Sequence, residues 1–518
     1  MRNMAPKTAA KTIVVGGRHL SLEEVCEAAR GAPLALENGA AFRDRIERGA
    51  KVLADAIASG RMVYGVNTGF GDSCTVTVPS EVVQQLPAHL VRYHGCGLGE
   101  YFDEPTSAAI LVTRLNSLAA GFSGVRLELL QQIEGLIRHR ILPLIPEEGS
   151  VGASGDLTPL SYVAAALMGD RQVRHQGREC AAAEALKAHG MKPLTLMPKE
   201  GLALMNGTSV MTALSCLAWE RAEYLVRLSS RITAMASIAL GSNAKHFAPG
   251  LFAVKPHSGQ QQVAARIFAD MGSSDHESAI RIQDRYSIRC SPHVIGVLAD
   301  ALTWMHRDIE NELNSANDNP IIDPDTGDIY HGGHFYGGHI AFVADSLKNA
   351  VANVADLLDR QLALLVDTRF NNGLPSNLSG AEGERAALNH GFKAVQIAVS
   401  AWTAEALKLS MPASVFSRST ECHNQDKVSM GTISARDCIR VLELTEQVAA
   451  ACLAATVQAL EIRRRKGNRP PARMQADIRA MHDDVLTLCP FVEEDRPLEQ
   501  ELRRLCAAVG ARRWTLYA

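Results

Sequence analysis

The sequence lacks the cysteine patterns of a zinc ribbon or a disulfide-rich protein. It contains 11 cysteines, an odd number, and no two of them form a Cys-x-x-Cys pair. Neither a zinc ribbon nor a fully paired disulfide framework is therefore favoured. Reduced thiols in a cytoplasmic protein are the simpler interpretation.

Long apolar runs are also missing. The N-terminal apolar stretch, residues 12–15, ends at Gly16 and is too short for the core of a signal peptide. The most apolar later run, residues 448–460, contains Thr456 and Gln458 and falls short of the roughly 18–20 residues of a membrane span. We therefore expect no membrane partner and a cytoplasmic location.

The sequence has no excess of basic charge. Its 53 Lys and Arg against 56 Asp and Glu give a formal net charge of −3, which disfavours an overall nucleic-acid footprint. Hydrophobic residues make up 47% and charged residues 21%, close to the averages of globular proteins. At 518 residues the chain exceeds one ordinary domain of about 100–200 residues.

Helical periodicity dominates what is present. Apolar residues recur every three or four positions in two shorter and three much longer stretches, which are residues 41–60, 123–139, 209–240, 339–367 and 431–463. A helix of 30 residues spans about 45 Å, a length typical of bundles. Strand signals are limited to residues 12–15 and a candidate hairpin at 321–330.

These patterns predict a mainly α fold with a long central helical bundle and a smaller mixed N-terminal domain. We place the N-terminal domain at residues 1–205, and the bundle with the C-terminal helices at residues 206–518. Loops rich in glycine, asparagine and proline interrupt the helices, and such loops are where functional sites tend to lie.

One of these loops, residues 149–160, has an unusual composition. It has three glycines in seven residues, but Asp156 and the lack of lysine fit neither a serine nucleophile elbow nor a phosphate loop. A plain loop ending in a helix N-cap is the simplest interpretation. The run Ala153-Ser154-Gly155 also permits a backbone reaction, because Gly155 has no Cβ and its amide nitrogen can approach the Ala153 carbonyl. Loss of water, including the Ser154 hydroxyl, would leave an electrophilic alkene.

Five other segments accompany this loop in a fixed order. The six segments are residues 63–71, 149–160, 205–209, 283–290, 312–320 and 424–426. With them the chain resembles the aromatic amino acid ammonia-lyase family, which includes histidine, phenylalanine and tyrosine ammonia-lyases and related aminomutases. The resemblance implies the cofactor 4-methylideneimidazole-5-one (MIO), formed from Ala153-Ser154-Gly155 in the N-terminal domain. It also implies a homotetramer whose active sites take residues from three subunits.

The resemblance assigns catalytic roles to several residues. The ring built on Ser154 captures the substrate amine, and Tyr64 takes the β-proton. Tyr64 needs nearby positive charge or hydrogen-bond donors for this, because the ordinary pKa of tyrosine is about 10. Asn206 matches the residue that hydrogen-bonds the ring oxygen, Tyr286 lies near the ring, and Arg289 binds the substrate carboxylate.

The substrate is predicted from the residues that match the family's pocket. They are Tyr93, His94, Gln283, Phe335, Asn424 and Gln425. Histidine enzymes commonly have Ser-His where this chain has Tyr93-His94, and a glutamate at the position of Gln425, so the two clues disagree. A neutral amide at 425 favours a phenyl or phenolic ring over an imidazole.

The main prediction is therefore an ammonia-lyase that converts L-tyrosine or a related aryl amino acid to a coumarate-type trans-arylacrylate, with room for a relaxed preference. The alternatives are a histidine ammonia-lyase giving urocanate, or a tyrosine or phenylalanine 2,3-aminomutase. A non-catalytic helical scaffold is disfavoured because the residues assigned to catalysis are all present.

Three histidines lie close together at residues 331–339. No Asp, Glu or Cys lies within this segment, and its spacing fits no zinc template, so no metal is expected. The family usually has asparagine where this chain has His334, a difference that would alter the hydrogen bonding of the pocket.

Overall fold

The computed structural model describes residues 11–272, 281–467 and 475–517. The chain forms two compact units, each assembled from several segments. Unit 1 consists of Met1–Leu217, His306–Asp345 and Pro412–Arg436, and unit 2 of Ala218–Met305, Ser346–Met411 and Asp437–Ala518. Two later segments thus return to the unit that holds the N-terminal part of the chain. The division predicted after residue 205 stays a prediction.

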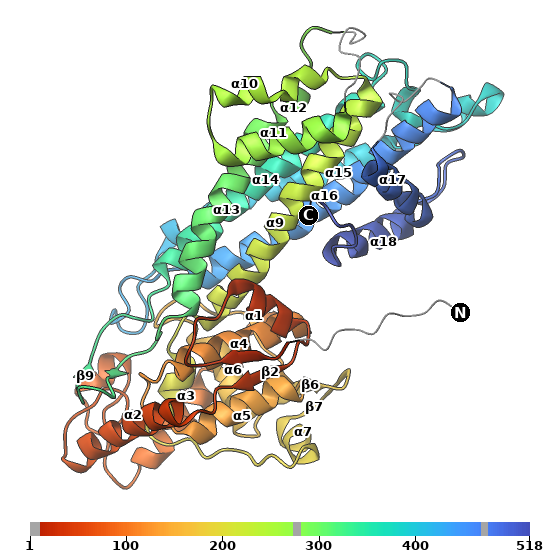
Figure 1. Cartoon of the computed structure of the whole chain (residues 1–518). Helices are drawn as coiled ribbons and strands as arrows, with labels where there is room; N and C mark the ends of the chain where they lie inside the picture. The colour runs from red at the N-terminus through yellow and green to blue at the C-terminus, as the bar shows by residue number, and fades with distance from the viewer. Residues whose placement is uncertain (1–10, 273–280, 468–474, 518) are drawn as a thin grey trace. The chain divides into compact units, whose positions relative to one another are not determined.

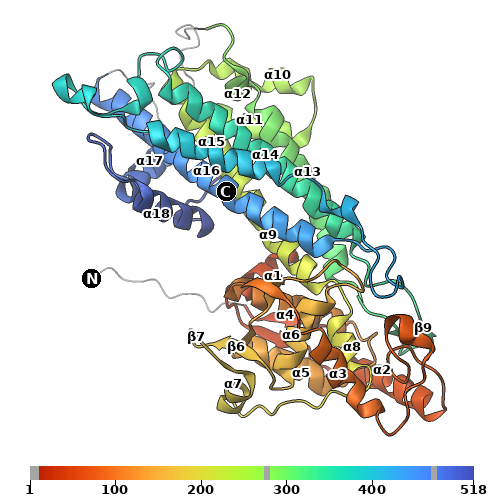
Figure 2. The same cartoon turned by 180° about the vertical axis from the view of Figure 1, so that it is seen from behind.

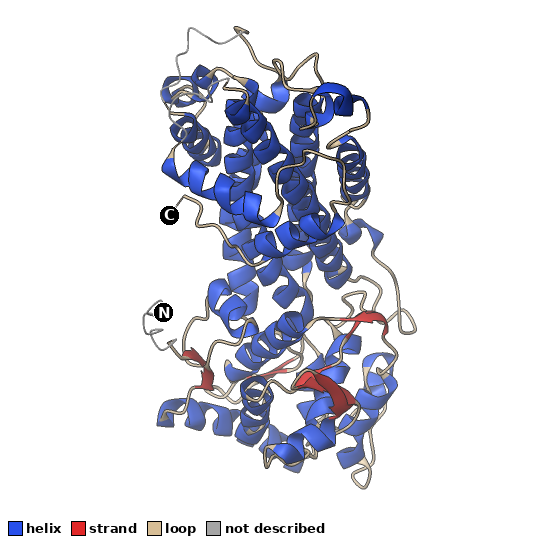
Figure 3. Ribbon diagram, turned by 90° about the vertical axis from the view of Figure 1, so that its right-hand side faces the viewer, coloured by secondary structure: helices blue, strands red, loops and turns tan. Residues whose placement is uncertain are grey.

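Short strands occur only in unit 1 among the described residues, as the red arrows in Figure 3 show. They are β1 (Ile13–Val15), β2 (Leu34–Leu36), β3 (Leu98–Tyr101), β4 (Leu142–Pro143), β5 (Pro146–Glu148), β6 (Gln172–His175), β7 (Arg178–Ala181), β8 (Ile321–Ile322) and β9 (Ile329–Tyr330). β1 pairs with β2 in parallel, and the other pairings, β3–β5, β4–β6–β7 and β8–β9, are antiparallel. The predicted hairpin at 321–330 is confirmed by the β8–β9 pairing of Ile321 with Tyr330.

Helices form most of unit 1 (Figure 1). They are α1 (Leu22–Ala29), α2 (Ala40–Ala58), α3 (Leu86–Tyr93), α4 (Glu104–Ala119), α5 (Leu127–Arg138), α6 (Leu157–Leu167), α7 (Ala182–Ala188) and α8 (Glu200–Met205), with the short 3-10 turns η1 (Gly71–Thr75), η2 (Val83–Gln85) and η7 (Ala413–Phe416). α4 is the core helix, because every residue from Ser107 to Ala119 is buried. It packs against α1 and α5, while α6 packs against α3 and α8.

All the regular elements in the described residues of unit 2 are helices. The elements wholly within it are η3 (Ala244–Phe247), α10 (Pro249–Ala253), α11 (Ser258–Met271), α12 (Tyr286–Arg289), η5 (Ser376–Leu378), η6 (Gly383–Ala387), α15 (Lys393–Lys408), α17 (Ala476–Leu488) and α18 (Glu499–Gly510). Four long helices also supply it, namely α9 (Ser209–Leu240), α13 (Ser291–Leu313), α14 (Gly338–Val366) and α16 (Gly431–Arg465). Figures 1 and 2 show these helices running side by side within the bundle.

Several polar side chains buried in the bundle have partners at its helix contacts. For example, Gln361 Nε2 on α14 donates to Thr233 Oγ1 on α9 at 3.0 Å. Cys452 Sγ on α16 donates to the Leu358 carbonyl at 3.4 Å. Such pairing offsets the cost of removing polar groups from water.

The sequence-based helix predictions are confirmed for the three long stretches. The predicted ranges 209–240, 339–367 and 431–463 correspond to α9, α14 and α16 within two residues at each end. The stretch predicted from residue 123 begins at Leu127 instead, because Gly124 adopts a φ of +63° that no α-helix contains. The predicted mainly α fold is confirmed. In the described ranges, no helix combines the length and apolarity needed to cross a membrane.

Candidate active site

A cavity of about 1090 Å³ lies within unit 1. Most of the residues predicted from the sequence to form the site line it, and these are Tyr64, Tyr93, His94, Ala153, Ser154, Asn206, Phe335, Asn424 and Gln425. They come from six separate parts of the chain. The fold of unit 1 therefore brings together side chains that the sequence separates by hundreds of residues.

The Ser154 loop has a tightly bent backbone. Gly152, Ser154 and Gly155 have φ angles of +74°, +52° and +77°, in the left-handed region that side chains disfavour. A Cβ added at Gly155 would lie 2.1 Å from the Gly207 carbonyl oxygen, so only glycine fits this position. Because Gly155 is free of side-chain crowding, its backbone can adopt the bend that cyclisation of residues 153–155 requires.

Asp156 fastens this loop to the start of α9. Its Oδ2 accepts hydrogen bonds from the backbone amides of Val210 and Met211, each at 3.0 Å. The Ser150 hydroxyl donates to Oδ1 at 3.1 Å, and the Thr432 hydroxyl donates to the same oxygen. Burial raises the pKa of Asp156, and these hydrogen bonds oppose that rise. The residue that excludes a nucleophile elbow in the sequence is thus a buried anchor of the loop.

Asn206 ends α8 on the other side of the loop. Its Nδ2 donates to the Asn319 carbonyl at 3.0 Å, while its buried Oδ1 has no hydrogen-bond partner. The fully buried guanidinium of Arg114 donates to the backbone carbonyls of Asn206 at 3.3 Å and Asn317 at 3.1 Å. Asn206 is therefore held firmly and keeps one unpaired polar atom in the wall of the cavity.

Tyr64 lies in the loop before η1. Its phenolic oxygen accepts a hydrogen bond from the Gly71 amide at 2.8 Å, which favours the phenolate. Burial nevertheless raises the pKa of Tyr64, and the negative charge of Glu421 adds to the rise. Within unit 1, Tyr64 thus has one donor and no net lowering of its pKa.

Glu421 joins the Tyr64 loop to the loop that carries Gln425. Both of its carboxylate oxygens accept from the Asp72 amide, at 3.0 and 3.1 Å. A Cβ at Gly71 would lie within 2.5 Å of this carboxylate, so Gly71 allows the two loops to approach closely. Cys422, the next residue, has a φ of +53°, so the turn itself is strained.

The pair Tyr93-His94 ends α3 at the cavity wall. The His94 Nδ1 lies 2.9 Å from the Leu90 carbonyl, which can only accept, so the neutral ring carries its proton on Nδ1 and leaves Nε2 as an acceptor. Burial lowers the pKa of His94, which favours this neutral form. The ring of Tyr93 packs against that of His94 with centroids 4.4 Å apart, and burial raises the pKa of Tyr93.

Gln425 uses both ends of its amide. Its Oε1 accepts from the Thr420 hydroxyl at 2.7 Å, and its Nε2 donates to Ser154 Oγ at 3.4 Å. The sequence predicts that Gln425 contacts the ring of the substrate. In the structure Gln425 contacts Ser154, the serine that would form the cofactor.

Four predicted site residues are not among those that line this cavity, namely Gly155, which follows Ser154, and three residues of unit 2. Gln283, Tyr286 and Arg289 belong to unit 2, whereas every residue of the cavity wall belongs to unit 1. Arg289 Nε donates to the Asp284 carbonyl at 3.0 Å, and its guanidinium lies 4.6 Å from the centre of the Tyr286 ring. Tyr286 is 72% exposed. These three residues thus belong to a different unit from Tyr64 and Ser154.

The histidine-rich segment contributes one ring to the site. His331 lines the cavity, and its Nε2 accepts from the Tyr64 amide at 3.4 Å. His334, whose difference from the family was noted above, is not among the lining residues. Among the described residues, the one grouping with metal-like spacing does not include these histidines.

Sequence reasoning missed several residues of the site. Asn319, His331 and Glu421 line the cavity, and Asp156 and Arg114 support it from beneath. Asn319 and Asp156 lie within segments that carry the family resemblance, so the sequence could have indicated that they belong to the site. The sequence contains no such indication for Arg114, because no pattern predicts which carbonyls an arginine in an apolar helical stretch contacts.

The residues present fit an MIO group at positions 153–155. The bent glycine-containing backbone, the anchored Asp156 and the unpaired Oδ1 of Asn206 lie around Ser154. Asn206 Oδ1 can only accept, so the group that this side chain offers to a ring oxygen is the second N–H of its Nδ2, the first of which donates to the Asn319 carbonyl.

Comparisons with known proteins show the family of the chain. The family model described as aromatic amino acid lyase matches residues 20–485. The chain is 36% identical to histidine ammonia-lyase from Geobacillus sp. (strain WCH70), over 95% of both chains. Its structure matches tyrosine aminomutase from Streptomyces globisporus with a TM-score of 0.89 and 31% identity over 97% of each chain. It matches histidine ammonia-lyase from Trypanosoma cruzi with a TM-score of 0.87 and 30% identity, over 97% of this chain and 94% of that one.

Proposed function

Because the chain belongs to the aromatic amino acid lyase family, we propose that it is a carbon–nitrogen lyase that eliminates ammonia from an aromatic L-amino acid. The observation that carries the proposal is the meeting of Tyr64, Ser154 and Asn206 in one cavity. Elimination from an amino acid requires removal of a weakly acidic β-proton together with a poor leaving group, so a base and an electrophile must act on the same molecule.

The electrophile is an MIO group formed from Ala153, Ser154 and Gly155, which activates the substrate for loss of its amine. Asn206 would hold the group through its side-chain amide. Asp156 would hold the Ser154 loop against the start of α9. Gln425, which already donates to Ser154 Oγ, lies on the other side of the same residue.

Tyr64 is the base in this proposal. The Gly71 amide stabilises the negative charge of the phenolate, whose oxygen then takes the β-proton and becomes a neutral phenol. Burial and Glu421 raise its pKa within one chain, so the phenolate needs further positive charge.

That charge would come from other subunits of a homotetramer with shared active sites. Tyr286, Arg289 and Gln283 belong to unit 2 and do not line the cavity of their own chain, and Tyr286 is largely exposed. Placed at the cavity of a neighbouring chain, Arg289 would bind the substrate carboxylate in a bidentate pair and bring a permanent positive charge to the site.

We infer that L-histidine is the first candidate substrate. The Nε2 of His94 is an acceptor, which suits a ring that carries an N–H or O–H donor better than a bare phenyl ring. Relatives with about a third of their residues identical to this chain are named histidine ammonia-lyases, which favours the imidazole. The amide oxygen of Gln425 is occupied by the Thr420 hydroxyl, whereas the Ser154 hydroxyl beside its Nε2 would leave as water when the MIO group forms.

L-Tyrosine is the second candidate, because a phenolic O–H would donate to the same His94 Nε2 and Gln425 carries no negative charge for an imidazole. An aminomutase uses the same residues and differs in how long the acrylate stays bound. Because the structure matches that of a tyrosine aminomutase, the experiment below also looks for β-amino acid products.

The test is product analysis of the purified enzyme with L-histidine, L-tyrosine, L-phenylalanine and L-DOPA in separate reactions, with Ser154→Ala as the inactive control. Chromatography that resolves acrylates from β-amino acids reads the outcome. Urocanate as the main product supports histidine, and coumarate supports tyrosine. Accumulating β-tyrosine or β-phenylalanine assigns the enzyme to the aminomutases, and the absence of every product overturns the proposal.

A further inference from the structure

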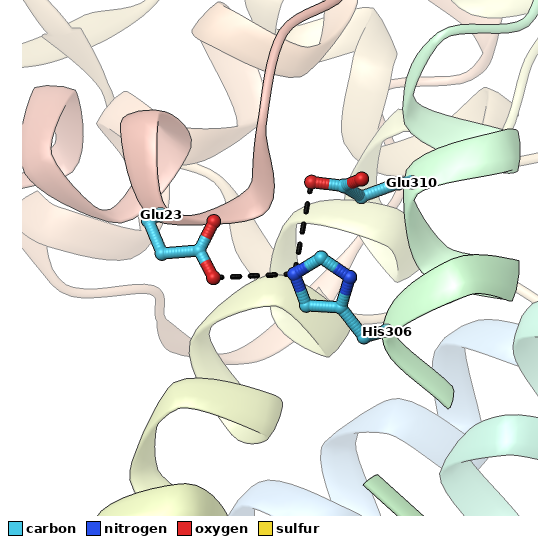
Figure 4. A group of neighbouring side chains, drawn as sticks. All are labelled: Glu23, His306 and Glu310. Carbon is cyan, nitrogen blue, oxygen red and sulfur yellow. Dashed lines mark hydrogen bonds and ion pairs between the residues drawn. The ribbon is translucent and has the colours of Figure 1, made fainter. Parts of the chain in front are cut away.

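A second cluster of side chains lies in unit 1 outside the cavity. His306 and Glu310 lie one turn apart on α13, and Glu23 lies in the first turn of α1 (Figure 4). The His306 Nε2 lies 3.1 Å from Glu23 Oε1 and 3.7 Å from Glu310 Oε1. Nothing in the proposed elimination uses these residues.

We propose that Glu23, His306 and Glu310 form a binding site for a divalent transition-metal ion, with Zn²⁺ as the probe of choice. Each side chain offers one ligand atom, and the three atoms lie within 4.8 Å of one another. Ligands at the usual Zn–N and Zn–O lengths of a tetrahedral site are about 3.3 Å apart. A metal ion therefore fits after movements of an ångström or so, which the half-exposed Glu23 side chain can make.

The chemistry of the donors selects the kind of metal. One imidazole nitrogen with two carboxylate oxygens suits Zn²⁺ and its neighbours in the first transition series, whereas Mg²⁺ prefers an all-oxygen octahedron. In Figure 4 the same ring nitrogen of His306 faces both carboxylates, which is the arrangement in which one ion replaces one shared proton. Water fills the remaining coordination positions.

The cluster is supported by fixed backbone on both sides. Glu310 Oε1 accepts from the Leu22 amide at 3.0 Å, which orients this carboxylate at the start of α1. The capping box between Ser21 and Glu24 fixes the same turn. Such support from outside the ligand set lowers the cost of assembling a metal site.

His19 adds a fourth donor beside the cluster. Its Nε2 lies 3.1 Å from Glu310 Oε2, and its side chain is exposed, so it is available as an additional ligand. Metal binding here would join residues 19–23 to residues 306–310. Because an ion that binds the folded chain and not the unfolded one stabilises the fold, Zn²⁺ would raise the thermal midpoint.

The experiment uses the full-length protein without a polyhistidine tag, treated with chelator and titrated calorimetrically with ZnCl₂ or MgCl₂ above the ordinary pKa of histidine. We expect one Zn²⁺ per chain, a higher thermal midpoint with Zn²⁺ than with Mg²⁺, and binding at least about tenfold weaker in His306→Ala. Glu23→Gln is the second variant, because it removes a ligand from an exposed position and keeps the fold.

His390→Ala is the matched control. His390 lies beside a single carboxylate, that of Asp495 at 3.7 Å, and should leave the affinity unchanged. The exposed thiols of Cys74, Cys96 and Cys422 are common to all variants and cancel in the comparison. No Zn²⁺ binding, or binding of equal strength in the wild type, His306→Ala and Glu23→Gln, overturns the proposal, and the cluster is then an ion-pair network only.

Discussion

The hydrogen bond between His94 Nδ1 and the Leu90 carbonyl decides what the side chain offers to a substrate. Because Nε2 remains an acceptor, we expect His94→Phe to lower kcat/KM for histidine and tyrosine by about 10–100-fold, and to lower it much less for phenylalanine. Burial lowers the pKa of His94, so the ring is neutral at neutral pH, and this acceptor is lost only as the pH falls through that lowered pKa. Steady-state kinetics with the three substrates at several pH values measure both effects. Equal losses of kcat/KM for all three substrates would contradict a role of His94 in recognising the ring of the substrate.

The neutral amide of Gln425 is the second residue feature that bears on the choice of substrate. Gln425→Glu keeps an acceptor for the Thr420 hydroxyl and adds a negative charge, but it removes the donor to Ser154 Oγ. We expect the ratio of kcat/KM for histidine over tyrosine to rise by about tenfold, because a carboxylate favours the imidazole. Competition assays with both substrates measure the ratio. Gln425→Met, which matches the size without the charge, is the control and should not raise it.

At the scale of elements, the start of α9 and the Ser154 loop are held together by one carboxylate. Asp156→Ala leaves the amides of Val210 and Met211 and two hydroxyls without their acceptor, so we expect a loss of about 2–4 kcal/mol in the free energy of unfolding. Because the loop is then free to move, the near-ultraviolet absorbance expected of the proposed MIO group should also be lost. Urea unfolding and difference spectra measure the two effects.

The control for Asp156 is another buried aspartate whose pKa burial also raises. Asp270 lies in unit 2, where it pairs with Arg231 at 2.8 Å. Asp270→Ala should lower the free energy of unfolding while leaving the MIO absorbance intact. If both variants lose the absorbance equally, Asp156 has no specific role in the loop.

At the scale of the whole molecule, the division of site residues between the two units predicts complementation between chains. Tyr64→Phe and Arg289→Ala should each be inactive alone. Coexpressed, they should form mixed tetramers that recover up to about a quarter of the wild-type activity, because some sites then combine an intact Tyr64 with an intact Arg289 from another chain. Activity of the purified mixture measures this. Mixtures as inactive as either parent would mean that one chain supplies both residues.

Much of the fold was predictable because it rests on local patterns. The periods of residues 209–240, 339–367 and 431–463 predicted three of the long helices closely, since nothing inside them breaks helical geometry. The prediction failed to find α4, because a helix buried on all sides shows little contrast between its faces. It also began α5 too early, because the left-handed Gly124 cannot be told from a helical glycine by composition.

Much of the candidate site was predictable for a different reason. Tyr64, Ser154, Asn206 and Gln425 were identified by motifs, and one cavity brings them together. What each can do was not predictable, because it depends on neighbours that are distant in the sequence. The free acceptor of His94, the occupied amide of Gln425 and the role of Glu421 all follow from contacts that no spacing encodes.

The sequence by itself determined the family, the helical periods and the residues able to form the electrophile, because these depend on residue type and local order. Only the tertiary structure decided that Asp156 anchors the Ser154 loop and that the cavity wall and Arg289 belong to different units. It also placed Glu23 beside His306. Such pairings are long-range: they exist only after folding has brought separate segments together, and the hydrogen bonds and burial that set their chemistry arise at the same moment.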